Sequence, residues 1–185
     1  MGEELEVFEW LSDAGCRSLE TVDKGDLKRF EPFDGSPMAP AWHTVRLRWR
    51  DAPDERRLPK SDCPALLAFV PTFSEKAVVA LRDLLEPAGE LLQLDVPGER
   101  FYAFNVTSVL EVLDEAASDV KRFEDGGVMR IVRYAFKNLD AIRQQPIFKI
   151  PQQRRSRIYV TTLFHRRVDQ AGLTGFDYRP LWKSG

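Results

Sequence analysis

Short apolar runs separated by turn residues fill most of this 185-residue chain, and this pattern limits the fold more than any other feature. The clearest run is 43–49, where Val45, Leu47 and Trp49 alternate with polar or charged side chains. Strict alternation is typical of a strand with one buried face. The run 65–70 is continuously apolar and ends at a proline, so we expect a more fully buried strand there.

Two segments have the composition of hairpins. The runs 91–96 and 100–105 are rich in strand formers and are separated by Pro97-Gly98, which favours a turn. A second hairpin is predicted over 119–136, around the turn sequence Asp125-Gly126-Gly127. Further short strands are expected at 147–150, 157–161 and 176–178.

Three segments predict helices. Ser74 has the chemistry of an N-cap, and apolar residues follow it at helical spacing until Pro87. Ser108 and Glu111 have the spacing of a capping box, which predicts a short helix over 109–115. A last helix is expected over 163–171, before Gly172 in the position that favours a left-handed cap.

The sequence thus predicts about eight short strands and about three helices. They do not alternate regularly, as the strands and helices of a doubly wound sheet do. We therefore predict an α+β fold with a mostly antiparallel or mixed sheet. The length fits one domain over residues 1–185, and an N-terminal subdomain over residues 1–41 remains an alternative.

Composition excludes several classes of protein. With 43% hydrophobic and 11% aromatic residues the chain has the material for a core, which is not typical of a disordered protein. Its longest uncharged stretch, 63–74, is too short for a bilayer-spanning helix, which needs about 20 residues. The acidic N-terminus lacks the pattern of a secretory signal, so we expect a cytoplasmic protein that does not contact membranes.

The net charge of −2 hides an asymmetry. Residues 1–100 carry 20 acidic against 13 basic side chains, whereas residues 101–185 carry 9 against 14. A long polar loop over 51–64 contributes four of the acids to the first half: Asp51, Asp54, Glu55 and Asp62. Such a division allows an acidic face and a basic face.

A search for catalytic groups finds little. The two histidines, His43 and His165, have no partner at the spacing of a metal site or a catalytic triad, and Cys16 and Cys63 fit no ligand pattern. On the predicted helix 109–115, three carboxylates would share one face, either as a metal or acid-base cluster or, as we favour, as a solvated surface: Glu111, Asp114 and Glu115. We expect no enzyme activity, catalytic residue, cofactor or metal.

Two binding functions remain as alternatives. The first is a small-ligand or nucleotide-binding module, with a cleft lined by Tyr102, Arg130, Tyr134 and Arg157. The second is an RNA-binding accessory protein that uses basic residues of the C-terminal half. Arg46, Arg48 and Arg50 would share a strand face that suits a phosphate backbone, but a pI near 5.8 argues against nucleic-acid binding.

A succession of motifs runs through most of the chain. The motifs are 62–70, FSEKA at 73–77, GELLQL at 89–94, 101–105, 109–114 with Ser118, PIFKI at 146–150, IYVT at 158–161 and AGLTGF at 171–176. Their order resembles the eleventh-numbered immunity-protein family of bacterial polymorphic toxin systems, first described around a myxobacterial domain. The resemblance covers residues 42–182 and depends on the succession of motifs rather than on any one of them.

The resemblance implies a small cytoplasmic protein that binds and neutralises a cognate toxin encoded nearby, protecting the producing cell, without catalysis or a cofactor. A tight inhibitor needs a pre-organised surface and charge complementary to its target. Toxins that attack nucleic acids present basic clefts, so we expect the acidic loop to contact the toxin, through Asp51, Asp54, Glu55 and Asp62.

Overall fold

The computed structural model describes residues 4–185, and over this range it has an α+β fold, as predicted. The strands are β1 (Glu6–Ser12), β2 (Leu19–Thr21), β3 (Val45–Trp49), β4 (Thr72–Ser74), β5 (Gly89–Val96), β6 (Glu99–Val106), β7 (Asp119–Arg122), β8 (Val128–Arg133), β9 (Ile147–Phe148), β10 (Tyr159–Thr161) and β11 (Phe176–Lys183). The helices are α1 (Glu75–Leu85), α2 (Leu139–Gln144) and α3 (Thr162–Gln170), with short 3-10 helices η1 (Lys24–Phe30), η2 (Ala39–Ala41) and η3 (Pro151–Gln153). None of the described helices is long and apolar enough to cross a bilayer.

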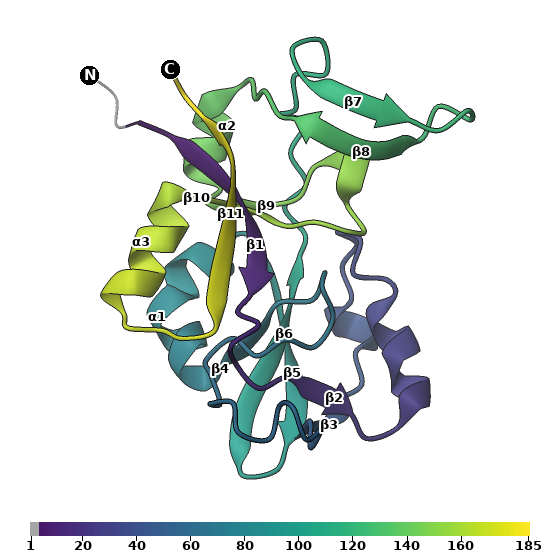
Figure 1. Cartoon of the computed structure of the whole chain (residues 1–185), viewed down its shortest axis with the longest axis vertical. Helices are drawn as coiled ribbons and strands as arrows, with labels where there is room; N and C mark the ends of the chain where they lie inside the picture. Colours follow the sequence, from purple (N-terminus) through teal and green to yellow (C-terminus); the bar gives the residue numbers. More distant parts are fainter. Residues whose placement is uncertain (1–3) are drawn as a thin grey trace.

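The strands form three sheets (Figure 1). A four-stranded antiparallel sheet has the order β11-β1-β10-β9, and a five-stranded mixed sheet has the order β2-β3-β5-β6-β4. In the mixed sheet only β3 and β5 run parallel to each other. Strands β7 and β8 pair only with one another, as the predicted second hairpin.

The four-stranded sheet is buried on both faces. On β1, Phe8 and Trp10 pack into one hydrophobic cluster with α1 and α3, whereas Val7 packs into a second cluster with Tyr159 and residues of the β7–β8 hairpin. Because successive side chains of a strand point to opposite faces, burial on both sides requires a continuous apolar run, and VFEW at 7–10 comes close to one.

The five-stranded sheet divides its side chains in the same way. On β6, Phe104 and Val106 join the first cluster, whereas Phe101 and Ala103 join a third cluster on the opposite face. Aromatic residues of the segment between β2 and β3, including Phe30, cover this third cluster. The five-stranded sheet therefore lies between the helices on one face and the segment that joins β2 to β3 on the other.

Helix α1 begins and ends as the sequence predicts. The Ser74 hydroxyl accepts a hydrogen bond from the Ala77 N–H at 3.1 Å, which satisfies one of the free N–H groups of the first turn. The helix buries Leu81 and Leu85 in the first cluster and contacts α3, which lies beside it in Figure 1. After α3, Gly172 adopts a left-handed φ of 58°, as its position predicts.

Two of the predicted elements are wrong. The apolar run 65–70 forms a tight turn rather than a strand, because the Val70 N–H bonds to the Leu67 carbonyl at 3.0 Å. The segment 109–115 is extended rather than helical. Its backbone bonds to distant segments, through the Leu110 N–H to the Lys149 carbonyl at 2.8 Å and the Asp114 N–H to the Ala135 carbonyl at 2.9 Å, so tertiary contacts override the capping-box signal.

The last strand is longer than predicted, because β11 continues through Pro180 to Lys183. A proline is tolerated there because β11 is an edge strand and its pairing with β1 shifts register between Val7 and Phe8. Helix α2 was not predicted at all. Its N-cap, Asn138, has a left-handed φ of 52° and makes no side-chain capping bond.

The first 41 residues contribute to both large sheets, since β1 lies inside the four-stranded sheet and β2 is an edge of the five-stranded one. The turn after η1 also contacts the C-terminal half. There, the buried ammonium of Lys149 donates a hydrogen bond to the Phe33 carbonyl, and Arg154 Nε donates to the Asp34 carbonyl at 2.7 Å. Gly35 adopts a φ of 98° against Val109, a conformation that favours glycine.

Candidate functional site

A groove lies along β2 at the edge of the five-stranded sheet, and part of the predicted acidic loop forms one of its walls. Its volume is about 840 Å³. The rest of the lining comes from β2, β3 and η1, from the segment that precedes β2, and from the turn at 65–66. The lining residues are Asp13, Ala14, Cys16, Ser18, Leu19, Glu20, Thr21, Val22, Lys24, Leu27, Arg48, Arg50, Asp54, Glu55, Leu58, Ala65 and Leu66.

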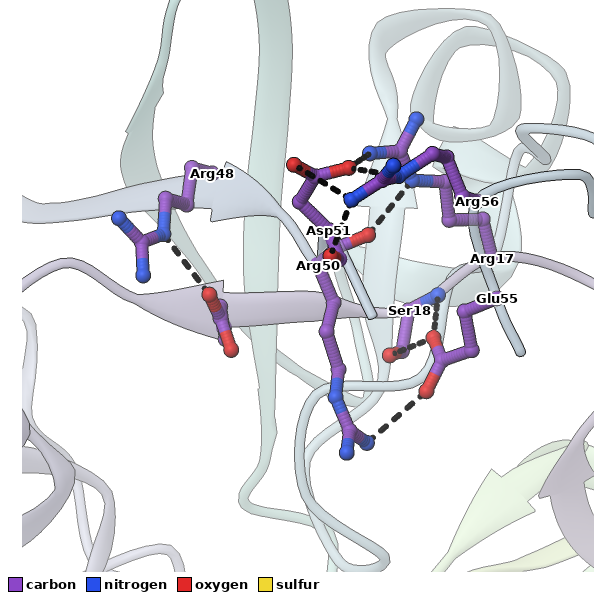
Figure 2. Close-up of polar contacts among 8 residues, drawn as sticks. Arg17, Ser18, Arg48, Arg50, Asp51, Glu55 and Arg56 are labelled. Atoms are coloured by element: carbon purple, nitrogen blue, oxygen red, sulfur yellow. Dashed lines mark hydrogen bonds and ion pairs between the residues drawn. The ribbon is translucent and has the colours of Figure 1, made fainter. Parts of the chain in front are cut away.

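Glu55 connects the loop to both strands (Figure 2). One of its carboxylate oxygens accepts hydrogen bonds from the Ser18 hydroxyl and from the Ser18 N–H, the latter at 3.0 Å, and the other lies 2.8 Å from Arg50 Nη1. The hydroxyl of Ser18 is the main cause that holds the pKa of Glu55 below its ordinary value, with help from Arg50. Glu55 therefore stabilises the wall of the groove as an ionised group.

Asp51 lies at the start of the loop and is also paired. Its carboxylate contacts Arg56 Nε at 2.8 Å and Arg17 Nη2 at 3.8 Å, as Figure 2 shows. The pair formed by Arg48 and Glu20 across β3 and β2 has a distance of 2.8 Å. Much of the loop's negative charge is thus already balanced by arginines of the same chain.

Asp54 differs from these acids. It is exposed and lines the groove, and the described residues supply its carboxylate with no hydrogen bond or ion pair. A charged group that is free to contact a partner is a stronger candidate for recognition than one already neutralised.

Asp62 lies elsewhere. It accepts hydrogen bonds from the Ser74 hydroxyl at 2.8 Å and from the Thr174 N–H at 3.1 Å, and it pairs with Lys76 at 3.3 Å. Burial alone would raise the pKa of Asp62, but these hydrogen bonds outweigh it and the pKa lies below its ordinary value. Of the four predicted contact residues, the structure brings Asp54 and Glu55 to the groove, places Asp51 next to them and places Asp62 at the start of α1.

Apolar side chains accompany the charges of the groove. Val22 and Leu27 are 48% and 41% exposed. The Val22 N–H bonds to the Arg46 carbonyl of β3, so the neighbouring Thr21 directs its N–H and carbonyl away from β3 and toward the open side of β2. The groove therefore offers apolar surface, one free carboxylate and unpaired strand backbone.

The alternative ligand cleft is only partly assembled. Tyr102 on β6 packs against the first cluster, whereas Tyr134 is buried in the second. Burial raises the pKa of Tyr134, and its hydroxyl donates a hydrogen bond to Gln153 at 2.9 Å. Arg157 pairs with the buried Glu9. Arg130 is exposed on β8. The structure thus places Tyr134 and Tyr102 in different parts of the core, and the described residues include no hydrogen bond that joins Tyr134 to Arg157.

Most of the other candidates for chemistry have structural partners. Arg46 and Arg50 pair with Asp95 and Glu55, so the basic strand face is largely neutralised. His165 packs against Tyr178 with ring centroids 4.2 Å apart. Because 109–115 is not a helix, its three acids do not share a helical face, and Glu115 pairs with Arg122 and accepts from Gln152 at 2.7 Å. Within residues 4–185, no group of three or more histidine, cysteine or acidic side chains is placed to hold a metal ion.

The sequence predicted the acidic wall of the groove but not the opposite wall. That wall comes from residues 13–27, which meet the loop only because β2 pairs with β3 and because the Arg17 N–H bonds to the Pro59 carbonyl at 2.9 Å. A contact between segments that lie far apart in the sequence leaves no periodic signal, so only the fold reveals it.

Two comparisons with known proteins bear on identity. No curated protein matches this chain. The model of the immunity protein family Imm11 matches residues 91–183, which is half of the chain and runs from β5 to the end of β11. The motifs before residue 91 lie outside the matched range. On the strength of this match, the chain belongs to the Imm11 immunity protein family.

Proposed function

We propose that this protein is a cytoplasmic immunity protein that binds a cognate toxin of a bacterial polymorphic toxin system, encoded nearby, and neutralises it in the producing cell. Membership of the Imm11 family is the observation that carries the proposal. The protein acts by binding alone, without catalysis or a cofactor. Most of its titratable side chains near the groove are engaged in ion pairs that hold the fold together, which suits a rigid binding surface.

The groove beside β2 is the surface that we expect to contact the toxin. Pre-organisation reduces the entropic cost of binding, and the Glu55 contacts hold the loop against Ser18 and Arg50. Val22 and Leu27 supply exposed apolar surface, as the centre of a protein interface requires. Because Asp51 and Glu55 are paired internally, Asp54 provides the carboxylate available to a basic group of the toxin.

Co-expression with the toxin encoded beside this gene tests the proposal. We expect the wild-type chain to restore growth of a host that expresses the toxin. Failure to restore growth, with soluble chain present, would contradict an immunity function.

A single charge reversal, Asp54→Lys, tests the contact surface. The Asp54 side chain makes no hydrogen bond or ion pair within the described fold, so stability should not change, whereas association with the toxin at low salt should slow by about tenfold. Glu111→Lys is the matched control, because Glu111 is also exposed and without a partner among the described residues but does not line the groove. Equal association rates for the two variants would exclude Asp54 from the interface.

A further inference from the structure

The β7–β8 hairpin is a second surface whose features the groove does not explain. Within residues 4–185 its two strands pair only with each other, and Figure 1 shows them as a ribbon at one end of the molecule, far from β2 and β3. An isolated two-stranded ribbon is marginally stable in water, and this one is held to the second cluster by Val120, Val128 and Ile131. The outer face of β8 remains free of the core.

Two irregularities in β8 turn extra side chains outward. Lys121 pairs with Arg130 and Arg122 with Val128, so Met129 has no residue opposite it on β7. The second register shift leaves Val132 without a partner in the same way. Such bulges redirect side chains.

In the sequence VMRIVR at 128–133, the side chains that face the core consequently recur at every third residue rather than at every second one. Val128 and Ile131 face the cluster, whereas the two residues after each of them are exposed. The four exposed residues are Met129, Arg130, Val132 and Arg133.

This outer face of β8 is apolar and basic at once. Met129 is 51% and Val132 52% exposed, and Phe123 in the adjoining turn is 53% exposed. Among the described residues, the arginines whose side chains make no hydrogen bond or ion pair are Arg57, Arg130 and Arg133. Two of these three therefore lie on one strand face, beside two exposed apolar side chains.

Met and Arg side chains are enriched at protein interfaces, and a free guanidinium pairs with a carboxylate in two parallel hydrogen bonds. We propose that the outer face of β8 is a second contact surface for the toxin, and that the complementary patch on the toxin is acidic around an apolar hollow. The identity of this partner rests on the function proposed above, whereas the chemistry of its patch follows from Met129, Arg130, Val132 and Arg133.

A nucleic acid fits this face less well. Met129 and Val132 offer no planar surface on which bases stack. The toxin patch that contacts β8 must differ from the toxin patch that contacts the groove. In the groove, the free carboxylate of Asp54 favours a basic group on the toxin. Two contacts of opposite sign would fix the orientation of the toxin.

Binding measurements with the purified full chain and the toxin encoded beside its gene test the inference. Arg130→Glu/Arg133→Glu should weaken binding by about tenfold or more and flatten its dependence on salt between about 0.05 and 0.3 M. Met129→Ser/Val132→Ser should weaken binding by a similar factor, mainly through faster dissociation. Arg130→Gln/Arg133→Gln removes the charges without reversing them and should give an intermediate loss.

Lys28→Glu/Lys137→Glu is the matched control, since both lysines are exposed and unpaired in the described fold and lie outside the hairpin and the groove lining. It should bind within twofold of the wild type.

If the wild type binds and the hairpin variants bind equally well, the proposal of a second contact surface is wrong and the immunity function stands. If the wild type does not bind the toxin, both proposals fail. Loss of binding to a labelled oligonucleotide, with toxin binding unchanged, would identify the face as a nucleic-acid site and overturn the inference.

Discussion

Lys149 makes the interior of this protein sensitive to pH. Lys149 is 1% exposed, and its ammonium group donates a hydrogen bond to the Phe33 carbonyl. Burial lowers the pKa of Lys149 from 10.5 to about 8, with a partial compensation from the negative charge of Asp34. The lysine thus connects the N-terminal segment to the family-matched half at the cost of placing a charge in the interior.

The folded chain releases the Lys149 proton near pH 8, whereas the unfolded chain keeps it until about 10.5. Between these values the unfolded state binds more protons, so raising the pH stabilises the fold, by about 1.4 kcal/mol for each pH unit. Over the whole window the contribution of Lys149 amounts to roughly 3 kcal/mol.

Urea unfolding of the wild type and of Lys149→Met at several pH values measures this effect. The free energy of unfolding of the wild type, relative to that of the variant, should rise by about 2 kcal/mol between pH 7 and 9.5. Taking the difference cancels the contributions of other groups whose pKa differs between the folded and unfolded chains, such as Cys63, whose pKa is raised by burial. Lys137→Met, at an exposed lysine, should show no such rise. A difference between wild type and Lys149→Met that stays constant within about 0.5 kcal/mol would refute the reasoning.

Two further substitutions test individual elements of the fold by urea unfolding. Ser74→Ala removes the N-cap of α1 and the 2.8 Å bond to Asp62, and should lower the free energy of unfolding by about 1–2 kcal/mol; an unchanged stability would show that the cap is dispensable. Gly35→Ala places a methyl group 2.6 Å from Val109 Cγ2 at a φ of 98°, and should cost at least about 1–2 kcal/mol, whereas Gly15→Ala, with a normal φ and a nearest contact of 3.1 Å to a side chain, should cost less.

Local chemistry in the sequence predicts the elements whose signals are local. The cap at Ser74, the turn at Pro97-Gly98 and the Asp125-Gly126-Gly127 turn all form where expected, because each depends on residues a few positions apart. The capping-box pattern at Ser108 failed for the opposite reason. Its segment gains backbone hydrogen bonds from 135–137 and from 149, and no local pattern reveals such partners.

The candidate site, too, could be predicted only in its local features. The acidic character of the loop was readable from the sequence, but its neutralisation was not, since Arg17, Arg50 and Arg56 meet Asp51 and Glu55 only in the folded chain. The hairpin was predicted, but its bulges were not, because they depend on the register with β7. The period of three in VMRIVR is the one signal that would have indicated them.

Titration of the toxin's own activity with the purified chain tests the central claim most directly. The account predicts that activity falls in proportion to the amount of immunity protein added and disappears near one equivalent, with Asp54→Lys and Arg130→Glu/Arg133→Glu each requiring more protein. A toxin that remains fully active in the presence of a tenfold excess of folded wild-type chain would contradict it.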